Sequence, residues 1–132
     1  MQLTENFNKS EFECKDGSVM PYSVLQNVKE LAKNLQVLRD YLGVPITLTN
    51  GYRSPHYNDV VLPSRGYKTS KNSQHKKGKA GDIKAQGKSP LQVKSAIEHL
   101  IATGKMKQGG VGIYKTFIHY DIRGYRARWD YR

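Results

Sequence analysis

The strongest constraint on the fold is one long stretch, residues 23–43, in which apolar residues recur every three or four positions. This spacing predicts a helix with one apolar face. Ser23 followed by Gln26 matches a capping box at its start, and Gly43 followed by Pro45 indicates its end. Other elements must cover the apolar face, which is formed by Val24, Leu25, Val28, Leu31, Ala32, Leu35, Leu38 and Leu42.

The rest of the chain combines short strands with a second helix. The helix is predicted over residues 90–103, with Ser89 as its N-cap, Gln92 completing a capping box and Gly104 ending it. Residues 51–74 form a long polar loop, and long loops in small domains are usually functional or mobile. Strands are predicted at residues 45–50, 81–85, 110–114 and 117–122. We therefore expect an α+β fold, a small and mostly antiparallel sheet with two main helices packed on it.

Bulk properties limit the classes of protein. A length of 132 residues suits one domain, and residues 1–22 are expected to be irregular, anchored by Phe7 and Phe12. No apolar run is long enough to span a membrane, and the first residues show no secretory signal. The single cysteine, Cys14, excludes an internal disulfide. A net charge of +11 favours a polyanionic partner, which can be nucleic acid, an anionic membrane surface or an acidic cell-wall polymer.

Two histidines have an aspartate at a useful offset. His119 and Asp121 are two positions apart on a predicted strand, so both point to one face. An exposed sheet face, with both side chains in water, explains this spacing equally well. His75 and Asp82 can meet only if the segment between them turns, and its glycines supply the flexibility. Two imidazoles and one carboxylate with an open fourth position are a ligand set of catalytic zinc sites.

Four stretches together resemble a known family. SQHKKGKAGDI (residues 73–83) fits the pattern SxHxxGxAxD at every fixed position. NFNKSEFECKDG (6–17), LTNGYRSPHYN (48–58) and GGVGIYKTFIHYDIRG (109–124) resemble further segments of the same family in the same order. The family is that of the zinc D-alanyl-D-alanine carboxypeptidases, or LAS metallopeptidases. It includes phage endolysin L-alanyl-D-glutamate peptidases and shares its fold with the hedgehog signalling domain.

The resemblance implies a role for each matching residue. It implies zinc bound by His75, Asp82 and His119 within a single zinc peptidase domain, residues 1–132. Arg53 would bind a substrate carboxylate or the developing oxyanion, because a guanidinium stays charged and offers a fork of donors. Ser73 would hydrogen-bond substrate near the metal, or act as a turn residue that orients the loop.

One position departs from the family pattern. Many members carry a Glu or Asp general base three residues before the last histidine, where this chain has Thr116. Asp121 is the next candidate, because it lies on the strand face of His119, and Asp59 in the long loop is a distant second. Asp121 would accept the proton from water, or it would orient a ligand or an arginine from the second shell. We favour the catalytic role.

These observations predict a zinc metallopeptidase that hydrolyses peptidoglycan stem peptides, of the D-Ala-D-Ala carboxypeptidase type or a closely related endopeptidase or endolysin. The sequence does not predict which peptide bond is cleaved. We expect a monomer that acts at the bacterial cell wall or periplasm, either cytoplasmic until released as a lysin or exported with a leader that this sequence lacks. Anionic wall polymer would contact a rim of Lys68, Lys71, Lys76, Lys77, Lys79, Arg123, Arg126 and Arg128.

Two other functions compete with this prediction. An inactive zinc-binding, wall-binding module of the same fold would explain the missing acid at Thr116. Nucleic-acid binding would use Tyr125, Trp129 and Tyr131 of the basic tail for base stacking. It would give no role to His75 or Asp82, so we expect no nucleic-acid partner.

Overall fold

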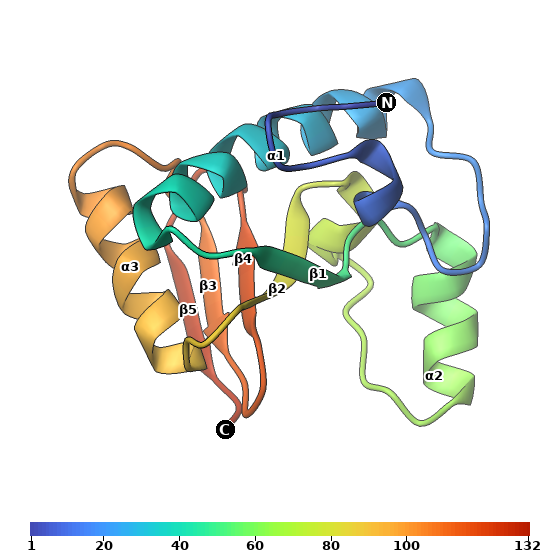
Figure 1. The fold of residues 1–132 in the computed structure, drawn as a ribbon. Helices are drawn as coiled ribbons and strands as arrows, with labels where there is room; N and C mark the ends of the chain where they lie inside the picture. Colours follow the sequence, from blue (N-terminus) through green and yellow to red (C-terminus); the bar gives the residue numbers. More distant parts are fainter.

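The computed structural model describes all 132 residues, which form one five-stranded sheet with two main helices (Figure 1). The sheet order is β1-β2-β4-β3-β5, and only the β3–β5 pair is parallel. The strands are β1 Ile46–Asn50, β2 Ala80–Ala85, β3 Gly110–Ile113, β4 Ile118–Asp121 and β5 Ala127–Asp130. The main helices are α1 Tyr22–Leu42 and α3 Pro90–Ala102. The predicted α+β class is thus confirmed.

The two faces of the sheet differ in character. Ile83 on β2 and the β4 residues Ile118 and Tyr120 are fully buried, in one core cluster with residues of α1 and α3. Phe7 and Phe12 are also fully buried in this cluster, as predicted. Because side chains alternate along a strand, the neighbouring positions of β2 and β4 point to the opposite face. That face carries the candidate site.

The ends of the helices test the predicted capping signals. Ser89 accepts a hydrogen bond from Gln92 N at 3.2 Å, and the Gln92 side chain accepts one from Ser89 N at 2.8 Å, which confirms this capping box. Gly43 ends α1 in the left-handed conformation at φ +69°. The predicted start of α1 is wrong, because Pro21 occupies the cap position and no side chain caps the helix. Ser23 is therefore already inside the first turn.

The long segment before β2 is more ordered than predicted. Tyr57–Val61 forms a π-helical turn (η2), which continues into the short helix α2, Leu62–Ser64. A 3-10 turn (η3), Gln74–Lys77, then leads into β2. Another 3-10 turn (η1), Lys9–Phe12, lies near the N-terminus. The expected loop is therefore a helical excursion that projects beside the sheet (Figure 1).

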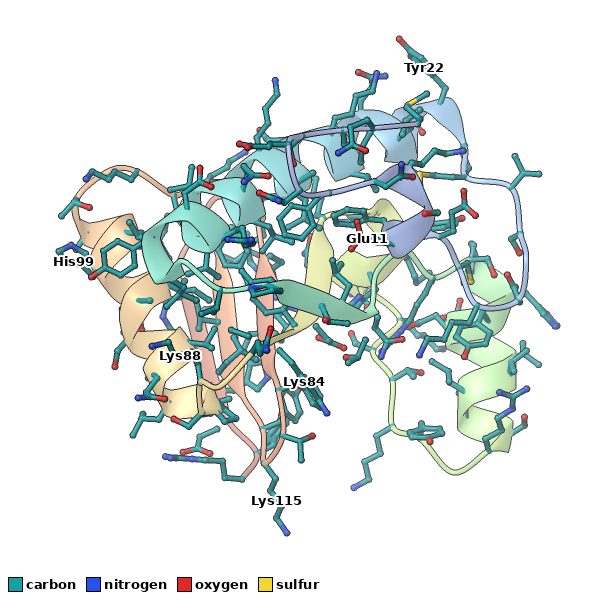
Figure 2. The ribbon with its side chains drawn as sticks, in the orientation of Figure 1. Glu11, Tyr22, Lys84, Lys88, His99 and Lys115 are labelled. Atoms are coloured by element: carbon teal, nitrogen blue, oxygen red, sulfur yellow. The ribbon has the colours of Figure 1, made fainter.

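The basic tail contains a strand that sequence patterns did not predict. β5 pairs in parallel with β3 at the sheet edge, with Gly112 opposite Trp129. No helix is both long and apolar enough to cross a membrane. Lys84, Lys88 and Lys115 are exposed, with Lys115 at the tip of the β3–β4 connection (Figure 2).

Candidate metal centre

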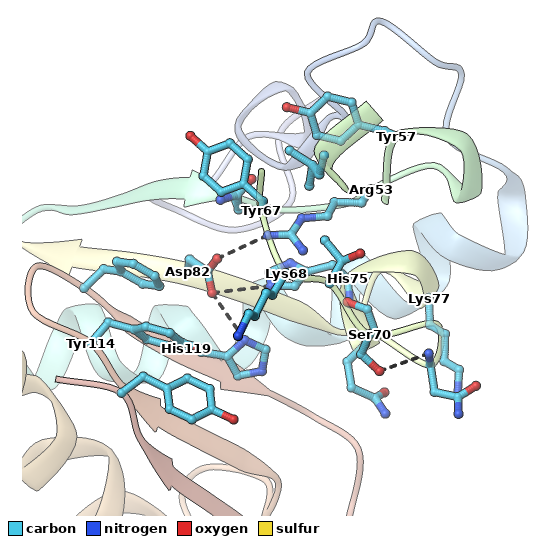
Figure 3. A pocket seen from close by; sticks show the side chains of 18 of the residues that line it. Arg53, Tyr57, Tyr67, Lys68, Ser70, His75, Lys77, Asp82, Tyr114 and His119 are labelled. Carbon is cyan, nitrogen blue, oxygen red and sulfur yellow. Dashed lines mark hydrogen bonds and ion pairs between the residues drawn. The ribbon is translucent and has the colours of Figure 1, made fainter. Parts of the chain in front are cut away.

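A large cleft of about 1540 Å³ lies between the sheet and the segment before β2 (Figure 3). One side, which we call the sheet wall, comprises Asp82, Tyr114, Phe117, His119, Arg123 and Trp129. The other side, which we call the loop wall, comprises Arg53, Arg65, Tyr67, Lys68, Ser73 and His75. The two walls meet at Asp82, which faces residues of both (Figure 3).

The three predicted metal ligands converge at this meeting point. Oδ1 of Asp82 lies 3.4 Å from Nε2 of His75 and 3.2 Å from Nδ1 of His119. The three ligand atoms lie within 4.8 Å of one another. Exposure is 4% for His75, 4% for Asp82 and 7% for His119, so little water reaches them. The alternative of a solvated His119 and Asp121 is therefore wrong.

Backbone register and one tight turn bring these ligands together. Asp82 on β2 is paired directly with His119 on β4, which places both side chains on one face. His75 comes from the 3-10 turn η3, which ends at Gly78 with φ +73°. A Cβ at Gly78 would also collide with Val24 on α1. Gly81 does not form part of the turn, because it lies within β2.

Each histidine is held by a hydrogen bond on the ring nitrogen that points away from Asp82. Nδ1 of His75 donates to the carbonyl oxygen of Gly51 at 2.8 Å, and Nε2 of His119 donates to Oδ2 of Asp121 at 2.7 Å. In the neutral imidazoles these bonds select the tautomers in which the two inner nitrogens have free lone pairs, and a metal ion must displace the proton that Nδ1 of His119 carries when this ring is charged. The inner nitrogens are therefore ready to bind a cation.

Asp121 is fully buried, and its carboxylate is saturated with hydrogen bonds. Oδ1 accepts from Gly110 N at 2.8 Å, Arg123 N at 3.1 Å and Arg123 Nε at 2.9 Å. Oδ2 accepts from Arg123 Nη2 at 2.8 Å and from His119. Gly110 permits this packing, because a Cβ there would collide with the carboxylate. Asp121 does not line the cleft, and its contacts are those of a residue that orients His119.

The electrostatics of the cluster suit a metal ion. Burial lowers the pKa of His75, which keeps its imidazole neutral at pH 7. Burial also acts to lower the pKa of His119, but hydrogen bonds to Asp121 and Asp82 outweigh it and raise this pKa. Burial opposes ionisation of Asp82, yet the two facing histidines hold its pKa well below the usual range. Two imidazole nitrogens and one ionised carboxylate fit a catalytic zinc site.

Arg53 and Ser73 also lie at the cluster, as predicted from the resemblance. Nη2 of Arg53 is 3.9 Å from Oδ2 of Asp82, and Nη1 donates weakly to Asn58 at 3.4 Å. Nε of Arg53 is buried without any partner, so the guanidinium has donors to spare. Ser73 caps η3 by accepting a hydrogen bond from His75 N at 3.2 Å, and it also lines the cleft.

Other predicted candidates lie outside the cleft. Thr116 is exposed in the β3–β4 connection, and Asp59 pairs with Lys76 at 2.8 Å. Asp82 is consequently the only carboxylate that lines the cleft. Of the eight predicted rim cations, those that line it are Lys68, Lys77 and Arg123.

Sequence analysis missed the part that Trp129 plays in this site. Trp129 lies on β5 opposite Gly112, and a Cβ at Gly112 would collide with the indole ring. The missing side chain lets the indole reach His119, with ring centroids 4.9 Å apart. Nε1 of Trp129 donates to the Tyr114 hydroxyl at 3.0 Å. A glycine inside a predicted strand often marks such a close approach, and this signal was available in GVGIY.

Comparison with known proteins identifies the family. The sequence model of peptidase M15 matches residues 3–121, which include all three clustered ligands. The chain belongs to the peptidase M15 family. The family is one of metallopeptidases, in keeping with the buried His-Asp-His cluster.

Two individual proteins are similar to this family member. A probable peptidoglycan L,D-endopeptidase, MepK of Haemophilus influenzae, is 40% identical over 91 residues. The match covers 67% of this chain but only 45% of that protein, so the chain spans less than half of the relative's length. The crystal structure of the L-Ala D-Glu endopeptidase ChiX of Serratia marcescens has a TM-score of 0.50 at 16% identity. The matched region covers 82% of this chain and 92% of ChiX. This second likeness shows a shared fold.

Proposed function

We propose that this protein is a zinc metallopeptidase that hydrolyses peptide bonds in peptidoglycan stem peptides. The observation that carries the proposal is the buried cluster of His75, Asp82 and His119 at the base of the cleft. Both histidines turn a free nitrogen toward the same carboxylate, so the site is organised before any metal arrives. A relative named as a probable peptidoglycan L,D-endopeptidase supports the substrate class.

Cleavage within the peptide is favoured over release of a terminal D-alanine. The cleft of about 1540 Å³ exceeds the roughly 300–1,000 Å³ typical of small-molecule pockets. It therefore has room for an extended peptide on both sides of the metal centre. Both similar proteins are also named as endopeptidases, which supports this reading over the carboxypeptidase type.

The residues of the two walls would divide the chemistry. Zinc held by His75, Asp82 and His119 would supply an activated water and polarise the scissile carbonyl. Arg53 would bind a substrate carboxylate or the developing oxyanion, for which its weakly bonded Nη1 is available. Ser73 would chiefly hold the turn that presents His75, with its substrate contact still a prediction.

We propose that Asp121 positions His119 and does not act as a general base. Its carboxylate is fully buried and accepts five hydrogen bonds, so taking up a proton would require it to give up at least one of them. It would hold His119 in the tautomer that leaves Nδ1 free for metal. A carboxylate of this kind raises the basicity of the ligand that it orients.

The charge of the molecule supports a location at the cell wall. A net charge of +11, with Arg53, Arg65 and Lys68 in the loop wall, would hold the protein near wall polymers and substrate carboxylates. We propose that it acts there as a single domain and a monomer.

The test is to load the purified protein with zinc, incubate it with defined stem peptides and identify the products by mass. We expect internal cleavage of at least one peptide and no cleavage after removal of the metal by a chelator. Intact peptides, together with retained zinc and binding to sacculi, would instead support the inactive wall-binding module. The lack of any cleft carboxylate besides Asp82 is the observation that favours that alternative.

A further inference from the structure

Tyr114 holds a fixed place in the sheet wall of the cleft, beside the metal centre. It directly follows β3, and its ring is stacked on Phe117 with centroids 4.3 Å apart and an angle of 10° between planes. The ring of Tyr131 packs against it edge-on at 5.6 Å. These contacts immobilise the phenol ring, so its hydroxyl has a defined position. Figure 3 shows Tyr114 on the same side of Asp82 as His119, with Arg53 on the other side.

The tryptophan that contacts His119 also orients the Tyr114 hydroxyl. Nε1 of Trp129 donates to the Tyr114 oxygen at 3.0 Å, while the indole packs on the His119 ring. An indole N–H can only donate, so the hydroxyl oxygen is the acceptor. The chain Tyr114–Trp129–His119 thus ties the hydroxyl to the metal centre through rigid rings.

The proton of this hydroxyl has no acceptor within the protein. The single hydrogen bond of the Tyr114 side chain is the one that it accepts from Trp129. Burial raises the pKa of Tyr114, the charge of Asp82 raises it further, and the bond from Trp129 offsets part of the change. The phenol is consequently neutral at pH 7 and remains a donor. Since the cleft holds no carboxylate besides Asp82, this donor points to a substrate oxygen rather than to a protein group.

We propose that the Tyr114 hydroxyl is a catalytic hydrogen-bond donor to the scissile carbonyl oxygen of the substrate as that oxygen becomes an oxyanion. The inference rests on the proposed peptidase function. In hydrolysis the oxygen of water adds to the carbonyl carbon, the C–N bond breaks, and a proton from water ends on the leaving amine. Negative charge grows on the carbonyl oxygen before the C–N bond breaks, and a preorganised donor stabilises this charge more than it stabilises the uncharged carbonyl. Tyr114 keeps its own proton throughout.

The experiment compares wild-type protein with Tyr114→Phe, which removes only the hydroxyl. Four quantities are measured with both zinc-loaded proteins. They are kcat and KM for a cleaved stem peptide, the Kd of an analogue with a phosphinate at the cleaved bond, and zinc affinity. We expect kcat to fall about 100-fold and the phosphinate to bind about 100-fold more weakly. KM and zinc affinity should change less than about threefold, because the uncleaved carbonyl carries no full negative charge and the zinc-bound protein without substrate holds no oxyanion.

The matched control is Tyr22→Phe, which removes an exposed hydroxyl at the start of α1, far from the cleft (Figure 2). It should match wild type in every measurement. Equal kcat and phosphinate binding in Tyr114→Phe and wild type would overturn the inference while leaving the peptidase function intact. An equal loss in zinc affinity would also overturn it, because it would show a purely structural role. A wild-type protein that cleaves no peptide would reject the proposed function and this inference with it.

Discussion

The two walls of the cleft are built on different principles. On the sheet wall, strand register and hydrogen bonds fix every polar group. Asp82 lies opposite His119, and Asp121 is saturated by Arg123 and Gly110. On the loop wall, His75 is held by Gly51 O and Arg53 N bonds to His75 O at 3.0 Å, whereas the side chains of Arg65, Tyr67 and Lys68 make no hydrogen bond or ion pair.

Under the proposed function, this difference would assign the chemistry to the sheet wall and the choice of substrate to the loop wall. A sheet holds side chains to fixed positions, because moving one strand breaks its ladder on both sides. Loops vary and move more easily, so they commonly set specificity on a constant scaffold. Under the proposed function, a metal ion and the groups that orient its ligands would therefore depend mainly on the sheet wall, whereas exposed loop-wall residues such as Tyr67 would select peptides.

The largest expected effect comes from the ligand that the loop wall contributes. His75→Ala should abolish both zinc retention and peptide hydrolysis, because two remaining ligands do not hold the ion. Zinc content after dialysis, measured by atomic emission, checks this. His99→Ala on α3, at an exposed position away from the cleft, should retain full zinc (Figure 2). Stoichiometric zinc in His75→Ala would show that the two walls do not share the metal.

Asp121→Asn tests the hydrogen bonds behind the sheet wall. We expect zinc affinity to fall about 10–100-fold, because the partner that orients His119 is altered. Breaking the buried ion pair with Arg123 should also lower the free energy of unfolding, by about 3 kcal/mol. Competition with a chromogenic chelator and urea unfolding measure the two quantities. Unchanged zinc affinity with lost turnover would instead identify Asp121 as the general base.

Acid should weaken metal binding through His119. Its raised pKa means that a proton competes for Nδ1 from a higher pH than at an ordinary imidazole. Zinc affinity should therefore fall as the solution is taken from about pH 8 to about pH 6, by up to about tenfold per pH unit. Asp121→Asn removes one cause of the raised pKa and should move this fall to lower pH. A flat affinity across the range would contradict the assigned tautomer.

Gly112→Ala probes the space that Trp129 occupies. A Cβ at this position would collide with the indole, so the free energy of unfolding should fall by about 1–3 kcal/mol. Thermal and urea denaturation measure this loss. Gly81→Ala is the matched control on β2, where the nearest atom to the new methyl is the flexible end of Leu48 at 3.2 Å and the side chains of Ile83 and Leu31 lie at an ordinary 3.8 Å. Equal stability of the two variants would mean that Trp129 is less fixed than the contacts indicate.

The smallest effect is expected from one exposed cation of the loop wall. Lys68→Glu should raise KM for carboxylate-rich peptides a few-fold, and the effect should shrink at high salt. Zinc affinity and kcat should not change. Lys88→Glu makes the same charge change outside the cleft and is expected to leave KM unaltered (Figure 2). A large fall in kcat for Lys68→Glu would place this side chain closer to the chemistry than the two-wall comparison allows.

Local signals in the sequence were sufficient for much of this structure. The capping box at Ser89 and the left-handed Gly43 depend on neighbouring residues alone, and both were predictable. The alternation in FIHYDI correctly divided β4 into a core face and a site face. The clustering of His75, Asp82 and His119 was predictable from the family resemblance, because the spacing of these residues alone did not show that all three meet.

Features that depend on distant contacts escaped prediction. β5 pairs with a strand that precedes it by more than ten residues, and parallel pairing leaves no hairpin signal. The environment of Asp121 depends on the glycine at position 110 and on how Arg123 folds back, neither of which shows in the spacing of His119 and Asp121. The capping pattern of Ser23 and Gln26 also failed, because Pro21 takes the cap position two residues before Ser23.

The tight contact between Gly78 and α1 would couple metal binding at His75 to folding. The turn that presents His75 rests on Val24, and Asn27 of α1 donates to Lys77 O at 2.9 Å. Any ligand that binds only the native state shifts the folding equilibrium toward it by mass action. Under the proposed function, zinc bound at His75 would therefore stabilise the docking of α1 as well as the site, and metal starvation would weaken the resistance of the whole chain to proteolysis.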